Sequence, residues 1–167
     1  MTAIRRPPLR RSAKGYDHKQ SGWLHYLLHF LVLPAAAFGL THQEEDPLAA
    51  VLFYVLAAVF ELIAVSFAHL RVRDRGDHLR VSFGPLPLFR KRIPYDRITR
   101  VDEARSSLLD GWGIHWVPGR GWTWNIRGFD CVELEVNGKR MRIGTDDRAG
   151  LADFVRERAG LAAAAPA

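Results

Sequence analysis

Three polar side chains interrupt an otherwise apolar stretch near the start of the chain and could do chemistry there. His25 and His29 lie four residues apart in the uncharged run 22–40, and Glu61 lies in the run 47–70. An imidazole and a carboxylate form a hydrogen bond or ion pair, and in a membrane they also relay protons. The i, i+4 histidine spacing matches that of zinc metalloproteases, but the glutamate of their H-E-x-x-H motif is missing, so the spacing does not indicate a protease.

Three other roles for these side chains remain open. His25 or His29 could ligate a haem iron or a chlorophyll-type magnesium, since intramembrane histidines serve both. A proton relay through His29 and Glu61 is a second possibility, although two spans alone make a poor pathway. The third and simplest is packing, in which His29 and Glu61 bind each other and lock two helices together. We expect packing, with no metal site and no cofactor.

Two predicted transmembrane helices, residues 22–40 and 47–70, position these groups. Each run is long enough for a helix to cross a bilayer, which takes roughly 20 apolar residues. His29 and Glu61 would both lie on the order of 10–15 Å below the membrane edge at 1.5 Å per residue. A stripe of mostly small residues on the second run favours close helix packing. We expect this stripe to comprise Ala50, Tyr54, Ala57, Glu61, Ala64 and Ala68, and the facing stripe His25, His29, Val32, Ala36 and Gly39.

The distribution of charge predicts how the hairpin is oriented. Residues 1–21 are strongly basic, the turn 41–46 carries three acids and no Lys or Arg, and arginines follow the second run. Positive residues favour the cytoplasmic side, so both termini should lie in the cytoplasm. We expect 1–21 to form an extended arm against the membrane or a partner. Ala35 to Ala37 resembles a signal-peptide cleavage site, but a second span follows directly, which favours a hairpin.

Composition limits the remaining classes of function. The net charge of +6 comes without a nucleic-acid-binding motif, so we expect anionic lipids and not nucleic acid as the charged partner. Cys131 is the single cysteine, which excludes an internal disulfide. It lies in an apolar strand pattern, where we expect it to pack as a small hydrophobe.

A single soluble domain should occupy residues 71–159, followed by a disordered tail, 160–167. From Leu70 onward the hydrophobic period changes from helical to two, as in strands with one apolar face. Asn137-Gly138 suits a tight hairpin turn, which would pair Glu133 with Arg142. We expect Thr145 or Asp146 to cap a final amphipathic helix. The predicted fold is a membrane α-helical hairpin followed by a small antiparallel β-barrel or sandwich capped by a C-terminal helix.

Several short motifs in this domain resemble bacterial PH-like domain membrane proteins. They follow the two apolar runs in the order Leu79-Arg-Val-Ser-Phe-Gly, Ile93-Pro-Tyr-Asp-Arg-Ile98, Gly111-Trp-Gly-Ile, Gly121-Trp, Val132-Glu-Leu and Ile143-Gly-Thr-Asp. The resemblance covers about 72–158 and the preceding hairpin. It implies a seven-stranded, partly open barrel with a helical cap, in a bacterial inner membrane. It also implies scaffolding or assembly of larger complexes, in related cases photosynthetic ones, and no catalysis.

Two surfaces of the domain are candidates for contact with partners. Tryptophans suit membrane interfaces and protein hot spots, and four of them crowd into 108–124. The resemblance gives Trp112 and Trp122 structural positions, and Trp116 is the best candidate for an exposed contact. The candidate partner residues of this segment are Trp112, His115, Trp116, Trp122 and Trp124. The candidate contacts for lipid headgroups or a protein partner are Arg71, Arg73, Arg90, Lys91 and Arg92.

These observations favour a non-catalytic protein. No nucleophile–base set, P-loop, dinucleotide motif or zinc spacing stands out in the sequence. We expect a membrane-anchored scaffold or accessory subunit that docks on, assembles or stabilises a larger integral membrane complex, photosynthetic or respiratory. The alternatives are a stand-alone sensor of anionic lipid surfaces and a cofactor-ligating membrane subunit.

Overall fold

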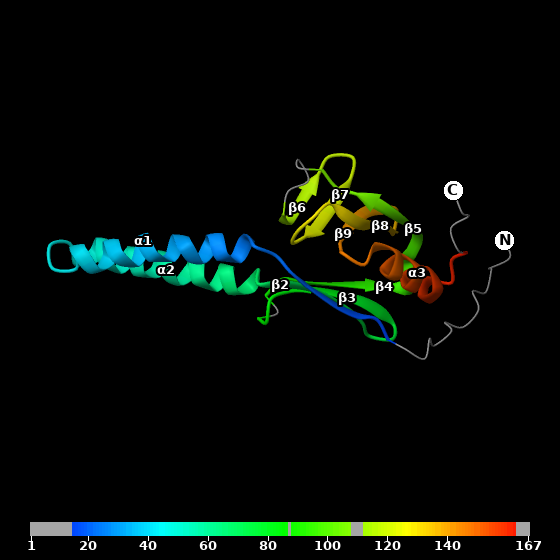
Figure 1. The fold of residues 1–167 in the computed structure, drawn as a ribbon, viewed down its shortest axis with the longest axis horizontal. Coiled ribbons are helices and arrows are strands. Elements are labelled where there is room, and N and C mark those ends of the chain that lie inside the picture. Colours follow the sequence, from blue (N-terminus) through cyan, green and yellow to red (C-terminus); the bar gives the residue numbers. More distant parts are fainter. Residues whose placement is uncertain (1–14, 87, 108–111, 163–167) are drawn as a thin grey trace.

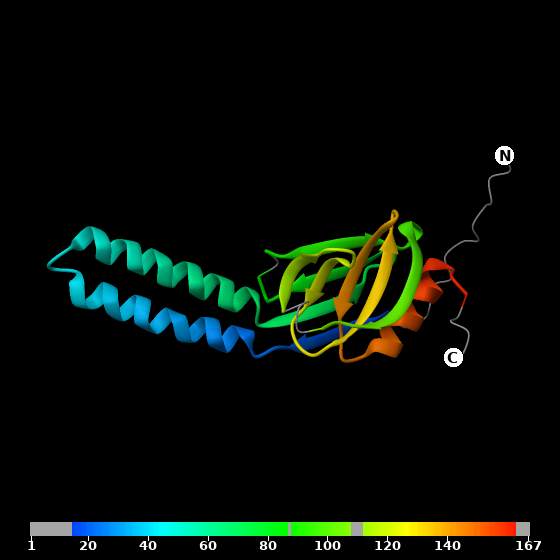
Figure 2. The same ribbon diagram turned by 90° about the horizontal axis from the view of Figure 1, so that it is seen from above.

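The computed structural model describes residues 15–86, 88–107 and 112–162. A long helical hairpin projects from a domain of two β-sheets, and a C-terminal helix lies at the end of the domain away from the hairpin (Figures 1 and 2). The first fourteen residues of the predicted arm, the last five of the predicted tail, and Gly111 lie outside the described residues.

The hairpin consists of α1 (Leu24–His42) and α2 (Pro47–Ser66), which lie antiparallel and side by side (Figure 2). Asp46 caps α2, because its Oδ1 accepts a hydrogen bond of 3.0 Å from the Ala49 N–H, and Pro47 occupies the first turn. Gly39 allows close approach, since a Cβ there would lie 2.7 Å from the Tyr54 ring. The Tyr54 hydroxyl donates to Gln43 Oε1 across the end of the hairpin at 3.3 Å.

Small residues pack the two helices together, largely as predicted. Ala50, Ala57 and Ala64 of α2 are buried. On α1 the buried positions are Ala35 and Gly39, whereas the sequence analysis assigned Ala36 to this stripe. Ala36 is half-buried beside them, so the observed stripe differs from the predicted one by one position.

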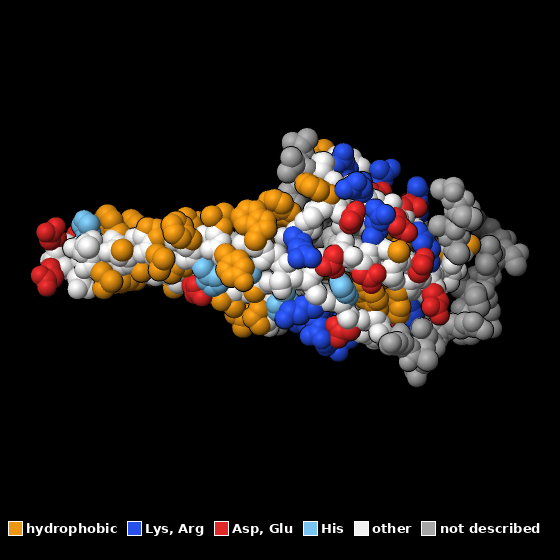
Figure 3. All heavy atoms as spheres, viewed as in Figure 1, with side chains coloured by type: hydrophobic (Ala, Val, Ile, Leu, Met, Phe, Trp, Pro, Cys, Tyr) orange, Lys and Arg blue, Asp and Glu red, His pale blue; other side chains and the backbone are white. Residues whose placement is uncertain are grey.

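Of the two predicted spans, 22–40 and 47–70, only the second contains a helix of the described residues, α2, that is long and apolar enough to cross a membrane by length and composition. Hydrophobic side chains cover the hairpin, and acidic ones gather at its far turn (Figure 3). The helix ends at Ser66, so the predicted span 47–70 was too long by four residues. His69 and Leu70 instead begin a strand.

The first sheet has the order β1-β2-β3-β4 and is antiparallel throughout. Its strands run in roughly the same direction as the helices (Figures 1 and 2). They are β1 (Asp17–Ser21), β2 (His69–Asp74), β3 (His78–Phe83) and β4 (Arg90–Pro94). The prediction that 1–21 is an arm outside the domain was therefore wrong for its last five residues, which pair with β2.

The second sheet has the order β5-β8-β9-β7-β6 and follows the 3₁₀ turn η1 (Tyr95–Arg97). Its strands are β5 (Ile98–Arg105), β6 (Gly113–Val117), β7 (Gly121–Asn125), β8 (Asp130–Val136) and β9 (Lys139–Gly144). The β7–β9 pair is parallel, whereas the prediction was antiparallel throughout. The described residues form nine strands in all, against the seven that the resemblance implies.

The β8–β9 hairpin has the predicted register. Glu133 lies opposite Arg142, and Leu134 lies opposite Met141. The Arg142 Nε donates to Glu133 Oε2 at 2.7 Å on the outer face, and Leu134 is buried on the inner face. Asn137 at φ 51° and Gly138 at φ 72° form the tight turn.

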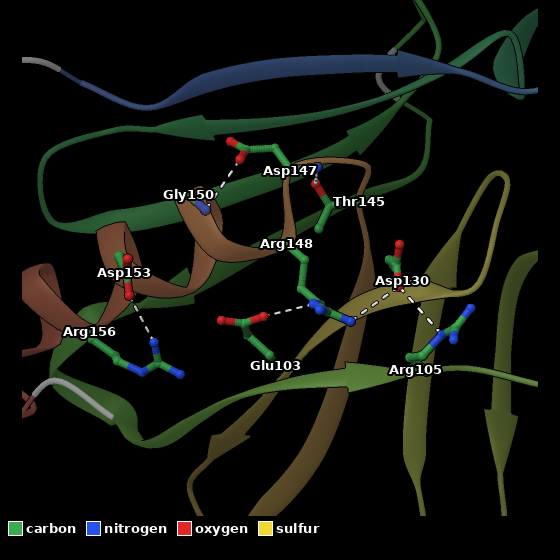
Figure 4. A network of polar contacts seen from close by, with 9 residues as sticks. All are labelled: Glu103, Arg105, Asp130, Thr145, Asp147, Arg148, Gly150, Asp153 and Arg156. Carbon is green, nitrogen blue, oxygen red and sulfur yellow. Dashed lines mark hydrogen bonds and ion pairs between the residues drawn. The ribbon is translucent and has the colours of Figure 1, made fainter. Parts of the chain in front are cut away.

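Helix α3 (Arg148–Ala159) packs on β5, β8 and η1. Asp147 caps it by accepting a 3.2 Å hydrogen bond from the Gly150 N–H (Figure 4), one or two residues after the predicted caps Thr145 and Asp146. Arg148, the first residue of α3, bonds to the second sheet: its Nε donates to Glu103 Oε2 at 2.7 Å and its Nη1 to Asp130 Oδ1 at 3.2 Å. Gly160 ends it in the left-handed conformation.

Candidate interaction surfaces

The hydrogen bond predicted within the hairpin is present. His29 Nδ1 lies 2.8 Å from Glu61 Oε2. His25 stacks its ring edge against His29 at 5.9 Å, and its own Nδ1 is buried without a hydrogen-bond partner among the described residues. Tyr54, the fourth residue of the predicted intramembrane set, lies at the other end of the hairpin and packs against Gly39.

This polar pair bridges α1 and α2 at the exposed edge of their interface, beside the buried small residues. The side chains of His29 and Glu61 are 37% and 48% exposed, whereas the alanines of α2 that face α1 are buried. Glu61 stands five residues before the end of α2, or about 8 Å along the helix axis. At the centre of a membrane-spanning helix a carboxylate costs roughly 2.5–3.5 kcal/mol on insertion scales, and such groups there face protein.

The tryptophans divide into buried and exposed members. Trp116 and Trp122 face each other across β6 and β7 and are 59% and 51% exposed. Trp124 is buried and packs against Phe83 at 5.8 Å between ring centroids. Trp112 is half-buried and meets Trp23, just before α1, edge-on at 5.1 Å.

Trp116 is exposed, as the sequence analysis proposed. Trp122, which the resemblance placed in a structural position, is exposed as well. His115 is half-buried on β6 opposite Thr123.

The outer face of the first sheet is basic. The strand register turns one face of each strand outward and places on it Lys19, Arg71, Arg73, Arg80, Arg90 and Arg92, with Asp17 as the one acid of these strands on that face. We call these seven residues the basic face. Lys91, predicted with its neighbours, is exposed on β4 opposite Val81 and so belongs to the other side of the strand.

Acids neutralise only part of the basic face. Asp17 accepts two hydrogen bonds of 2.7 Å from Arg71 and one of 2.9 Å from Arg73. Arg92 pairs with Asp77, which lies in the β2–β3 turn. Arg80 and Arg90 pair with no acid among the described residues.

Two surface grooves of about 390 Å³ each lie on this face, and Arg80 lines both. One adjoins β3 and β4, with Arg90 and Arg92, and the other adjoins β1 and β2, with Lys19 and Arg71. Burial, followed by the positive charges of Lys19 and Arg71, lowers the pKa of His69 in the second groove. The imidazole therefore stays neutral near pH 7, while the groove around it stays positive.

Sequence reasoning missed Lys19 and Arg80 as members of this face. A signal for Arg80 was present, because a tight turn at 74–77 would pair residue 73 with 78 and so place Arg80 opposite Arg71, on the same face; in the structure the register is shifted and Arg80 lies opposite Arg73. Lys19 had no such signal, because the all-polar segment 17–21 shows no apolar alternation that would predict a strand.

Among the described residues, no group of three or more His, Cys, Asp or Glu side chains converges as a metal would require. Compared with known proteins, the chain matches no family model and no curated sequence.

Proposed function

We propose that this protein is a non-catalytic, membrane-anchored scaffold or accessory subunit with a PH-like domain. Its two helices cross the bacterial inner membrane as a hairpin, with the N-terminus and the domain in the cytoplasm. It docks on a larger integral membrane complex, photosynthetic or respiratory, and assembles or stabilises it. The apolar surface of the hairpin and the basic flanks in the sequence support this topology.

The exposed His29–Glu61 pair is the observation that carries the proposal. A pair whose only task was to hold α1 and α2 together would be expected to point between them, where small residues lie instead. In lipid, half-exposed polar groups are stabilised when another helix covers them and adds hydrogen bonds. A transmembrane helix of a partner protein would fulfil this role.

Replacing Glu61 by alanine should release the protein from its complex. We expect the full-length protein to co-purify from native membranes in digitonin with an integral membrane partner. Glu61→Ala should lower the recovered partner about tenfold, since an interhelical hydrogen bond in a membrane contributes about 1–2 kcal/mol. Native gels and mass spectrometry of the purified material measure this.

Two variants control the experiment. Glu44→Ala removes an exposed acid in the interhelical turn and should leave recovery unchanged. Glu61→Gln keeps a hydrogen-bonding group beside His29 and should retain most of the partner. Equal recovery with Glu61→Ala and the unaltered chain would refute the docking role of this residue.

The two alternatives predict different results for the same preparation. A lone monomer in digitonin would favour a stand-alone sensor of anionic lipids, a function that the exposed arginines of the basic face also support. A visible absorption band in the purified protein would favour a subunit that ligates a haem or chlorophyll-type cofactor through His25 or His29.

A further inference from the structure

Three arginines form a continuous row across the basic face. The strand register places Arg80 of β3 directly between Arg73 of β2 and Arg92 of β4. Like charges directly opposite on neighbouring strands destabilise a sheet. Asp17 and Asp77 neutralise the two outer arginines, so the charge of Arg80 between them is the one that an anionic ligand covering the row would neutralise.

The row stands too far from the membrane to bind headgroups of the bilayer that holds the hairpin. The strands of the first sheet continue the direction of the helices (Figures 1 and 2), so the basic face runs along the membrane normal. Arg73 lies four residues beyond His69, where β2 begins, or about 13 Å at 3.3 Å per residue. The headgroup region of one leaflet is only about 5–8 Å thick.

A second, shorter row lies nearer the membrane. Arg71 of β2 lies opposite Lys19 of β1 on one side and Ser82 of β3 on the other, and Ser82 lies opposite Arg90 of β4. The two rows are two residues apart along each strand, about 7 Å. The charges are thus spread over a nearly flat area, and a single small anion would reach only a few of them.

We propose that the basic face binds an acidic segment from the cytoplasmic part of the membrane protein on which the hairpin docks. This inference rests on the proposed function for the identity and position of the partner. In an extended chain, side chains on one face repeat every two residues, or about 7 Å, which matches the separation of the two rows. Arg80, which lines both grooves and has no acidic partner among the described residues, is the main contact.

A peptide titration tests the basic face directly. The full-length protein in nanodiscs of phosphatidylcholine is titrated with a fluorescent ten-residue polyglutamate peptide, and anisotropy reports binding. Arg80→Gln should weaken binding about tenfold, because it removes the charged donor that hydrogen bonds to a carboxylate of the peptide. Arg100→Gln removes the same charge from an exposed site on β5, where Arg100 already pairs with Asp102 at 2.5 Å, and should change the affinity less than twofold.

Two outcomes would overturn the inference. The first is no binding of the peptide, or an equal loss with Arg80→Gln and Arg100→Gln, which would show a non-specific attraction. The second is displacement of the peptide by added phosphatidylglycerol vesicles, but not by phosphatidylcholine vesicles, together with weaker binding of the phosphatidylglycerol vesicles to Arg80→Gln. That result would assign the face to a second lipid surface.

The titration uses purified protein and needs no native complex. Its failure would therefore leave the Glu61 result intact. Conversely, a lone monomer in digitonin together with specific peptide binding would refute the docked hairpin and leave the acidic ligand of the basic face in place.

Discussion

Replacing Asp74 by asparagine is expected to lower the free energy of unfolding by about 3–5 kcal/mol, the cost of removing one partner from a buried ion pair. Asp74 pairs with Arg158 of α3, and both side chains are only 6% exposed. Asp74 Oδ1 also accepts hydrogen bonds from the Tyr95 hydroxyl at 3.0 Å and the Gly76 N–H at 2.8 Å. Without the carboxylate, the buried guanidinium of Arg158 loses its counter-charge. Urea unfolding followed by tryptophan fluorescence measures the change.

Asp102→Asn is the matched control for this variant. It removes a carboxylate from an ion pair that is 42% exposed on the Asp102 side. Exposed pairs contribute at most about 1 kcal/mol, so the control should unfold near the urea concentration of the unaltered protein. Equal losses in the two variants would contradict a special role for the buried pair.

The contribution of Asp74 should disappear in acid. Burial acts to raise the pKa of Asp74, but the hydrogen bonds from Gly76, Arg158 and Tyr95 outweigh it, so the pKa in the folded protein is lowered. A lowered pKa stabilises the fold above the unfolded value of about 3.9 and loses that effect as the pH falls through the folded value. The stability difference between the unaltered protein and Asp74→Asn should therefore be constant near neutral pH and shrink below about pH 4.

Gly121→Ala should destabilise the domain by about 2–5 kcal/mol, the sum of a left-handed backbone cost and an overpacking cost. Gly121 begins β7 at φ 80°, and a Cβ there would lie well inside van der Waals contact with the backbone carbonyl of Arg140 in β9. Because backbone atoms cannot rotate away as a side chain does, the alanine would push apart the parallel β7–β9 pair. Thermal unfolding by circular dichroism measures the loss.

Gly119→Ala, two residues earlier in the chain, separates the left-handed backbone cost from the overpacking cost. Gly119 has a similar φ of 74°, but a Cβ there would meet no atom within 4 Å. It should cost only about 1–2 kcal/mol, the left-handed term alone. If both alanines destabilised the domain equally, the close approach to β9 would contribute nothing.

The elements that the sequence predicted well are those set by local patterns. The β8–β9 register follows from two turn residues and alternating side chains, all within fourteen residues, from 131 to 144. The buried face of β2 and β3 follows from strict alternation, which gives Leu70, Val72, Leu79 and Val81 to the core. The His29–Glu61 contact followed from two apolar runs joined by a short turn, which had to fold back on each other.

The remaining features depend on contacts between distant parts of the chain. The segment Asp17–Ser21 has a mostly polar composition, and it becomes a strand because β2 offers it an edge. The parallel β7–β9 pair depends on packing that no local pattern encodes. The buried pair of Asp74 and Arg158 joins residues 84 positions apart. In the sequence, each residue taken alone would be predicted to be an exposed charge.

Strand β1 has a consequence for how this protein is made. Gln20 pairs with Leu70, so β1 leaves the ribosome well before the strand that completes its hydrogen bonds. Both helices are synthesised in that interval. The ladder between β1 and β2 therefore closes only after both helices have been synthesised, and it joins the chain segments that enter and leave the hairpin.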